Sequence, residues 1–341
     1  MSGISGLRLL SVLTVTLGLT AFPGSAAEPC LEGPDCWALF GIDRALKLPV
    51  YRTHDLHKPA PEVLRGIILI HGFSRNAHRY FPQITKMAKQ EGLERETLVV
   101  APSFSIRDDD RPHRRPGELY WKRNKHWRRG DKSVRRPEGR VSSFAAVERL
   151  LAHFGDKGLF PNLGKITVVG HSAGGQFVQR FALGHAPIEA LAEVRVRYVA
   201  ANPGSYMYLN GYRPAPAFDG AFRLPEASAS CGKYNRYEYG LERLNGYMSG
   251  AGKEAIVARL RARELVLLLG AEDKDRDHVS LNRGCRASLQ GRDRLERGLQ
   301  FQAHLDRFFR PHATRTLLVP GVGHSSRRMF QSEQGRAAIF F

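Results

Sequence analysis

Lys165-Ile-Thr-Val-Val-Gly-His-Ser-Ala-Gly-Gly175 is the stretch of sequence that decides the fold. The apolar run 166–169 leads directly into the pattern G-x-S-x-G, and a helical pattern begins near Gln176. A strand, a sharp turn and a helix in this order raise the Ser172 hydroxyl above a sheet, beside the positive end of the helix. Glycines flank the serine because such a turn leaves no room for side chains. The pattern predicts that Ser172 is a nucleophile.

Short apolar runs and amphipathic stretches alternate along the rest of the chain. The apolar runs predict buried strands at 65–71, 97–101, 165–169, 194–200, 264–269 and 316–319. Apolar residues recur between them at helical spacing, namely Phe144, Val147, Leu151 and Phe154; Phe177 and Phe181; and Leu295, Leu299 and Leu305. We therefore expect residues 28–341 to form a single α/β domain with a mostly parallel sheet and helices on both faces.

A serine nucleophile requires a base that takes its proton and an acid that orients the base. Asp273 follows the predicted strand 264–269, and His324 follows the last predicted strand in a glycine-flanked turn. The carboxyl ends of parallel strands meet at one edge of the sheet, where the active sites of open α/β sheets lie. We expect Asp273 and His324 to complete a catalytic triad with Ser172. The competing acids nearby are Glu272, Asp275 and Asp277.

Acyl transfer also needs two backbone donors for the oxyanion of the tetrahedral intermediate. Ala173 follows the nucleophile and supplies one N–H group. His71-Gly72-Phe73 ends the first long apolar strand, which makes the Phe73 N–H the candidate for the second donor. The alternative is that this glycine marks only a tight turn.

With these residues in place, the chain resembles the α/β-hydrolase superfamily over residues 62–341. The segment 169–178, VGHSAGGQFV, is similar to that of secreted esterases and lipases. More loosely, HGFSRNA at 71–77 is similar to the oxyanion loop of polyhydroxybutyrate-depolymerase-type esterases. The chain lacks an H-G-G-G run, which sets it apart from the hormone-sensitive-lipase branch. The resemblance implies an α/β-hydrolase fold with a cap insertion, and a serine esterase mechanism that uses no cofactor and no metal.

Two stretches interrupt the alternation of strands and helices. Residues 103–140 hold 13 Lys/Arg and 6 Asp/Glu, with Trp121 and Trp127 among them. Such tryptophans either stack on nucleic acid bases or pack against the body of the protein, and we favour packing because no nucleic-acid-binding motif accompanies them. Residues 204–263 are too long for a connector and rich in tyrosine, which predicts a cap or lid over the site. These tyrosines are Tyr206, Tyr208, Tyr212, Tyr234, Tyr237, Tyr239 and Tyr247.

The composition excludes a disordered or fibrous chain, because 42% of the 341 residues are hydrophobic and 25% are charged. With Lys+Arg 52 against Asp+Glu 33, the formal net charge is +19. Such a charge has three alternative explanations: binding to nucleic acid, binding to an anionic membrane surface, or a biased coding sequence without a function attached to the charge. We expect the basic insertion 103–140 to draw anionic substrates or surfaces toward Ser172.

The N-terminus predicts export. Arg8 precedes an apolar run, 9–22, which is followed by Pro23-Gly24 and small residues. This pattern is typical of a signal peptide spanning 1–27, and the run is too short for a membrane anchor. No later apolar run reaches the length of a membrane span. We expect a periplasmic or secreted protein, which makes nucleic acid the least expected partner.

Four cysteines remain after the predicted cleavage, and their even number suits an oxidising compartment. Three pairings are possible; the sequence-local one joins Cys30 to Cys36 and Cys231 to Cys285, and free buried thiols are the alternative. A metal site is not indicated, because the chain has neither C-x-x-C nor H-E-x-x-H.

The sequence as a whole predicts a secreted serine hydrolase that cleaves carboxylic esters, of a small molecule or a polymer, through an acyl-enzyme. Two alternatives stay open. One is an amidase or peptidase that uses the same triad. The other is a noncatalytic protein of the same fold that binds polyanions or anionic surfaces.

Overall fold

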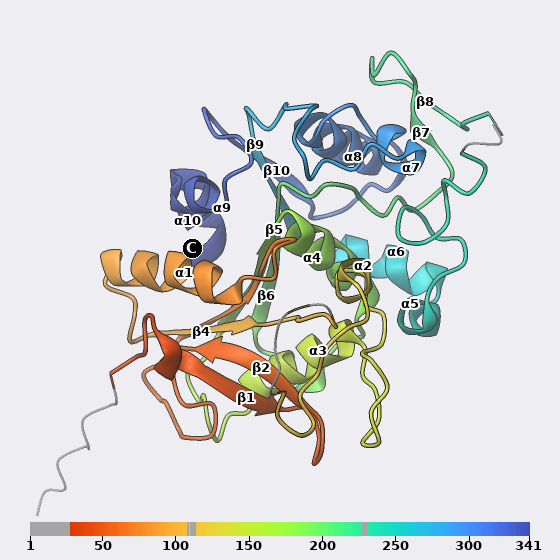
Figure 1. The fold of residues 1–341 in the computed structure, drawn as a ribbon. Helices are drawn as coiled ribbons and strands as arrows, with labels where there is room; N and C mark the ends of the chain where they lie inside the picture. The colour runs from red at the N-terminus through yellow and green to blue at the C-terminus, as the bar shows by residue number, and fades with distance from the viewer. Residues whose placement is uncertain (1–27, 108, 110–113, 227–230) are drawn as a thin grey trace, which may run out of the picture.

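The computed structural model describes residues 28–341 except 108, 110–113 and 227–230. The predicted signal peptide, 1–27, lies outside the described residues. Within them, an eight-stranded sheet runs through the centre in the order β1-β2-β4-β3-β5-β6-β9-β10 (Figure 1). Its strands are β1 (Trp37–Gly41), β2 (Lys47–Arg52), β3 (Arg65–Ile70), β4 (Thr97–Pro102), β5 (Lys165–His171), β6 (Arg195–Ala201), β9 (Glu264–Gly270) and β10 (Arg315–Val319).

The six predicted strands are confirmed, and all six run parallel to one another, from β4 to β10. The sequence analysis missed β1 and β2. These two form an antiparallel hairpin that pairs with β4 at the edge of the sheet. β1 is only partly buried and β2 contains Pro49, so neither gives the continuous apolar run that marks a central strand.

Helices cover both faces of the sheet, as predicted, because the parallel strands are apolar on both sides. α1 (Ala77–Gln90), α9 (Ser326–Gln331) and α10 (Glu333–Phe340) pack on one face, against residues such as Ile67 and Leu69. α3 (Ser143–Phe154), α4 (Ala173–Gly184), α6 (Lys253–Ala262) and α8 (Arg294–Phe308) pack on the other, against Ile68 and Ile70. The remaining short elements are α2 (Asn124–Trp127), α5 (Gly246–Ala251), α7 (Cys285–Ser288), β7 (Arg213–Pro214), β8 (Phe222–Arg223) and the 3-10 helices η1 (Pro34–Cys36) and η2 (Glu189–Leu191).

One detail of the predicted helix α8 is wrong. Leu299 was expected on its apolar face, but this side chain is 42% exposed. Leu299 and Leu305 are six positions apart, which places them on different sides of a helix with 3.6 residues per turn. The buried face instead carries Phe301 and Leu305.

The tryptophans of the basic insertion are core residues. Trp121 and Trp127 are both fully buried, and Phe104 stacks on the Trp127 ring with centroids 5.5 Å apart. Their predicted packing against the body is confirmed, so neither ring is available to stack on a nucleic acid base.

The tyrosine-rich segment also packs into the body. Tyr206 stacks on Phe301 of α8 with ring centroids 4.7 Å apart, and Tyr208 lies 4.5 Å from the ring of His304. Tyr237 donates a hydrogen bond to the Arg129 carbonyl and so joins this segment to the basic insertion. A role for the segment as a lid stays a prediction.

The cysteines form the sequence-local pairs, Cys30 with Cys36 and Cys231 with Cys285. The second pair bridges 54 positions of chain and joins the tyrosine-rich segment to the start of α7. No helix in the described part of the chain is long and apolar enough to cross a membrane.

Replacing Cys231 and Cys285 together by serine should destabilise the protein by about 4 kcal/mol, because the bridge restricts a long loop of the unfolded chain. Thermal unfolding followed by circular dichroism measures the loss. The matched control replaces Cys30 and Cys36, whose separation is only 6, and should cost less. Equal melting temperatures for the wild type and the Cys231/Cys285 variant would contradict this role for the bridge.

Candidate active site

Ser172 occupies the sharp turn between β5 and α4, as the sequence predicted. Its backbone is in a rarely populated region, with φ 59° and ψ −114°. The flanking glycines make this turn possible. A Cβ atom on Gly170 would lie 2.5 Å from the backbone of Gly174, and one on Gly174 would lie 2.3 Å from the Ile70 carbonyl oxygen. The turn therefore packs backbone against backbone, and the partly exposed Ser172 side chain projects from the carboxyl edge of the sheet.

The three predicted triad residues come together at this edge. His324 Nε2 lies 2.9 Å from Ser172 Oγ, and His324 Nδ1 lies 2.7 Å from Asp273 Oδ2. Asp273 follows β9 and His324 follows β10, so each side chain leaves the carboxyl end of its strand. The competing acids lie elsewhere: Glu272 pairs with Lys274, Asp277 pairs with Arg283, and Asp275 accepts from the Asp277 N–H.

Asp273 has a second partner besides His324, which the sequence analysis missed. Arg294, the first residue of α8, donates to Asp273 Oδ1 at 3.3 Å, and both side chains are 1% exposed. Arg294 also donates to Ser280 Oγ at 2.9 Å. One arginine among many carries no motif, so only the folded chain reveals that it lies behind the carboxylate.

The two predicted oxyanion donors follow the carboxyl ends of the adjacent strands β3 and β5. Ala173 is the first residue of α4, where an N–H group has no acceptor within the helix. Phe73 follows β3, and no described residue accepts a hydrogen bond from its N–H group. The Phe73 carbonyl accepts hydrogen bonds from Arg75 Nη1 at 3.0 Å and from Asn124 Nδ2 at 2.9 Å. These two bonds fix the orientation of the backbone at Phe73.

The basic insertion holds this loop in place. Arg75 has a positive φ of 55° and forms an ion pair with Asp109 at 2.5 Å. Asp109 and Asn124 both belong to the insertion 103–140. Below them, His71 Nε2 accepts from the Phe104 N–H at 3.0 Å, and burial lowers the pKa of His71 to about 4. The neutral ring therefore donates from Nδ1 to the Gly72 carbonyl at 2.9 Å.

Comparisons with known proteins agree with this architecture. The family model of the alpha/beta hydrolase family matches residues 67–338. The chain belongs to this family. A comparison with curated proteins finds no match.

Among the described residues, no group of three His, Cys, Asp or Glu side chains is placed to hold a metal ion.

Two solved structures share the fold of this alpha/beta hydrolase. Poly(aspartic acid) hydrolase-1 from Sphingomonas sp. KT-1 has 24% sequence identity and a TM-score of 0.61; the match covers 89% of this chain and 97% of that one. LpqC, a poly(3-hydroxybutyrate) depolymerase from Bordetella parapertussis, has 22% identity and a TM-score of 0.58; the match covers 85% and 83% of the two chains.

The surroundings of His324 keep its ring neutral. Burial lowers the pKa of His324, the hydrogen bond and the charge of Asp273 act in the opposite direction, and the charges of Arg294 and His278 lower the pKa further. The His278 ring lies 5.2 Å from the His324 ring. On the other side, 4.6 Å away, lies His171, whose own pKa is far below its usual value because the ring is buried. A neutral His324 can accept a proton from Ser172 at neutral pH.

Replacing Arg294 by glutamine should raise the pKa of His324, because it removes a buried positive charge beside the Asp273–His324 pair. An imidazole base works only when unprotonated, so the acid limb of the pH profile of hydrolysis should move to higher pH, by roughly 0.5 to 1 unit. The measurement is kcat/KM against pH. Arg292→Gln removes the same charge two residues away, from an exposed side chain, and should leave the limb in place. A limb that moves to lower pH, or not at all, in Arg294→Gln would refute this role.

Proposed function

We propose that this alpha/beta hydrolase is a secreted serine hydrolase that cleaves carboxylic esters. The observation that carries the proposal is the continuous chain of hydrogen bonds from Ser172 through His324 to Asp273. In this arrangement Asp273 fixes the Nδ1–H tautomer of His324, and Nε2 then presents its lone pair to the Ser172 hydroxyl.

The proposed reaction proceeds in two steps. Ser172 Oγ attacks the ester carbonyl while His324 Nε2 takes its proton, and the N–H groups of Phe73 and Ala173 stabilise the oxyanion. The imidazolium then gives this proton to the departing alkoxide, which leaves an acyl-enzyme. In the second step His324 takes a proton from water, the hydroxide attacks the acyl group, and the acid is released as Ser172 regains its proton.

The names of the two similar enzymes bear on the proposed substrate class. The two similar structures belong to enzymes named for the polymers poly(aspartic acid) and poly(3-hydroxybutyrate), which supports a polymeric or small-molecule ester for this chain. Because poly(aspartic acid) is joined by amide bonds, amide cleavage by the same triad is the second candidate. A panel of esters and amides with the same acyl group separates the two.

Export is part of the proposal. The predicted signal peptide 1–27 is its first support, and the two disulfides, Cys30–Cys36 and Cys231–Cys285, are compatible with an oxidising compartment. N-terminal sequencing of the protein released from cells should begin at Glu28.

Replacing Ser172 by alanine should lower the turnover of p-nitrophenyl acetate by about 10⁴-fold or more, because no acyl-enzyme can form. The fold should survive, since alanine is smaller than serine and fits the same turn. Ser249→Ala, on the exposed side of α5, is the matched control and should keep full activity. Undiminished turnover by Ser172→Ala would exclude the assignment, and an inactive wild type would favour the noncatalytic alternative.

A further inference from the structure

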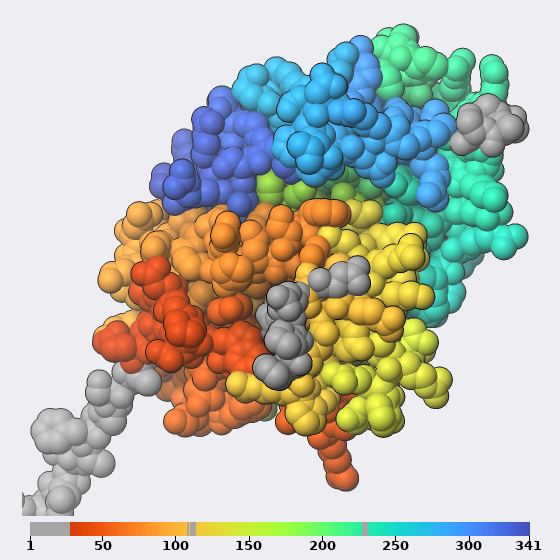
Figure 2. Space-filling model, in the orientation of Figure 1, coloured from red at the N-terminus to blue at the C-terminus, as the bar shows by residue number. Residues whose placement is uncertain are grey.

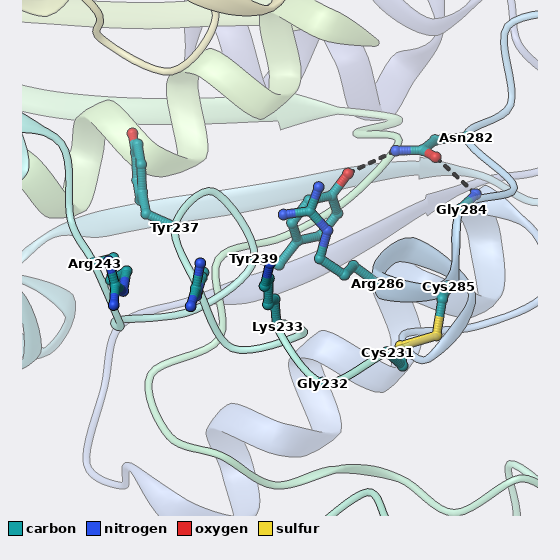
Figure 3. Close-up of a pocket in the computed structure, with 11 residues that line it drawn as sticks. Cys231, Gly232, Lys233, Tyr237, Tyr239, Arg243, Asn282, Gly284, Cys285 and Arg286 are labelled. Atoms are coloured by element: carbon teal, nitrogen blue, oxygen red, sulfur yellow. Dashed lines mark hydrogen bonds between the residues drawn. A yellow bond between two sulfur atoms is a disulfide. The ribbon is translucent and has the colours of Figure 1, made fainter. Parts of the chain in front are cut away.

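A pocket that no triad residue lines is formed by segments that follow β6 and β9. Its volume is about 890 Å³, and two segments far apart in the sequence form its walls, 231–243 and 282–286 (Figure 3). Four of its lining side chains are cationic: Lys233, Arg236, Arg243 and Arg286. No lining residue is acidic.

The cations of this pocket have no close carboxylate partner among the described residues, although the charge of Arg286 contributes to lowering the pKa of the adjacent Glu238. None of the four cations forms an ion pair with a described carboxylate. Glu238, adjacent to the lining residue Tyr237, already pairs with Arg180 at 3.4 Å and with Arg128 at 3.8 Å. Glu242 accepts a hydrogen bond from Asn235 at 3.0 Å and does not line the pocket. Four cations without an ion pair around one cavity attract an anion.

The walls of the pocket are fixed before any ligand arrives. The Cys231–Cys285 disulfide joins the two segments. Asn282 donates to the Tyr239 hydroxyl at 2.7 Å and accepts from the Gly284 N–H at 2.9 Å (Figure 3). The Arg286 guanidinium lies 4.8 Å from the centre of the Tyr239 ring. A preformed site loses less conformational entropy on binding than a flexible surface does.

The pocket shares the carboxyl edge of the sheet with Ser172. The chain runs from Asp273 directly into the wall at Asn282. Arg297 of α8 donates to the carbonyls of Asn282 and Gly204, each at 2.8 Å. Gly204 in turn lies against the Gln176 side chain, in the first turn of the helix that follows Ser172.

The segments that follow the strands also meet at the surface. On the face drawn in Figure 2, the blue segments that follow β9 lie directly above the orange and yellow segments that follow β3 and β4. A substrate that contacts both Ser172 and the pocket would lie along this edge.

We propose that the pocket is an anion subsite, which binds a carboxylate-bearing part of the substrate whose carbonyl Ser172 attacks. The inference rests on the proposed hydrolase function and narrows its substrates to anionic chains. Lysine and arginine donate strong, charge-assisted hydrogen bonds to carboxylates, and the Tyr239 and Asn282 side chains offer uncharged contacts in the same wall. A concave site with fixed walls suits a flexible acidic chain better than the flat surface of a membrane.

The experiment compares two series of substrates. One consists of p-nitrophenyl monoesters of dicarboxylic acids of increasing length; the other consists of the same molecules with the free carboxylate capped as a methyl ester. Lys233→Gln/Arg286→Gln removes one cation from each wall. For the longer anionic esters it should raise KM about tenfold with kcat unchanged, so their kcat/KM relative to the capped esters falls about tenfold.

Lys89→Gln/Arg307→Gln is the matched control. It also removes one lysine and one arginine charge, both exposed, from helix ends at the opposite edge of the sheet, and should leave that ratio unchanged. An unchanged ratio in Lys233→Gln/Arg286→Gln would overturn the proposal. So would a loss of binding to anionic vesicles with no change in the ratio, because the pocket would then contact a surface.

Calorimetric binding of a short oligo-aspartate separates this proposal from the proposed function, because it needs no turnover. If no ester is cleaved but Lys233→Gln/Arg286→Gln weakens this binding, the anion site stands and the hydrolase fails. If capped esters are cleaved while neither the binding nor the ratio changes, the hydrolase stands and the anion subsite fails.

Discussion

The close packing of backbone against backbone at Ser172 is the constraint on which the rest of the site depends. Gly170 and Gly174 allow β5 and α4 to meet in a turn that no pair of larger residues would permit. The turn places Ser172 in a strained conformation and makes Ala173 the first residue of α4. His324 and Asp273 reach this point because both follow strands of the same parallel sheet. Geometry of this kind is set by the fold, so the candidate triad is organised before a substrate binds.

The charge of the chain has two separate consequences. The insertion 103–140 has a structural role, because Asp109 and Asn124 hold the loop that carries the Phe73 N–H. Its attraction of anionic substrates or surfaces stays a prediction. Four cations that form no ion pair with a described carboxylate, Lys233, Arg236, Arg243 and Arg286, line the pocket formed by 231–243 and 282–286. The structural contacts of the insertion and the cationic pocket are therefore separate features of the chain, and the anion-binding role is proposed for the pocket.

The sequence predicted the parallel strands and the candidate site because both have local signatures. A strand buried on both faces is a continuous apolar run, and the glycines around Ser172 identify its turn. The hairpin β1–β2 was not predicted, because its two strands are recognisable from their backbone pairing and not from a run of apolar residues. Arg294 escaped for a similar reason: its place behind Asp273 depends on how α8 packs against the loop after β9. Contacts between distant segments leave no periodic signal in either one.

The central claim is that Ser172 is an activated nucleophile and not merely a serine in a tight turn. Labelling with a fluorophosphonate, followed by mass spectrometry of the digested protein, tests this claim most directly, because the reagent reacts with activated serines. The account predicts one adduct per chain, on the peptide that contains Ser172, formed by the folded protein and strongly slowed in His324→Gln. A folded chain that forms no adduct, or forms it on another residue, would contradict the account.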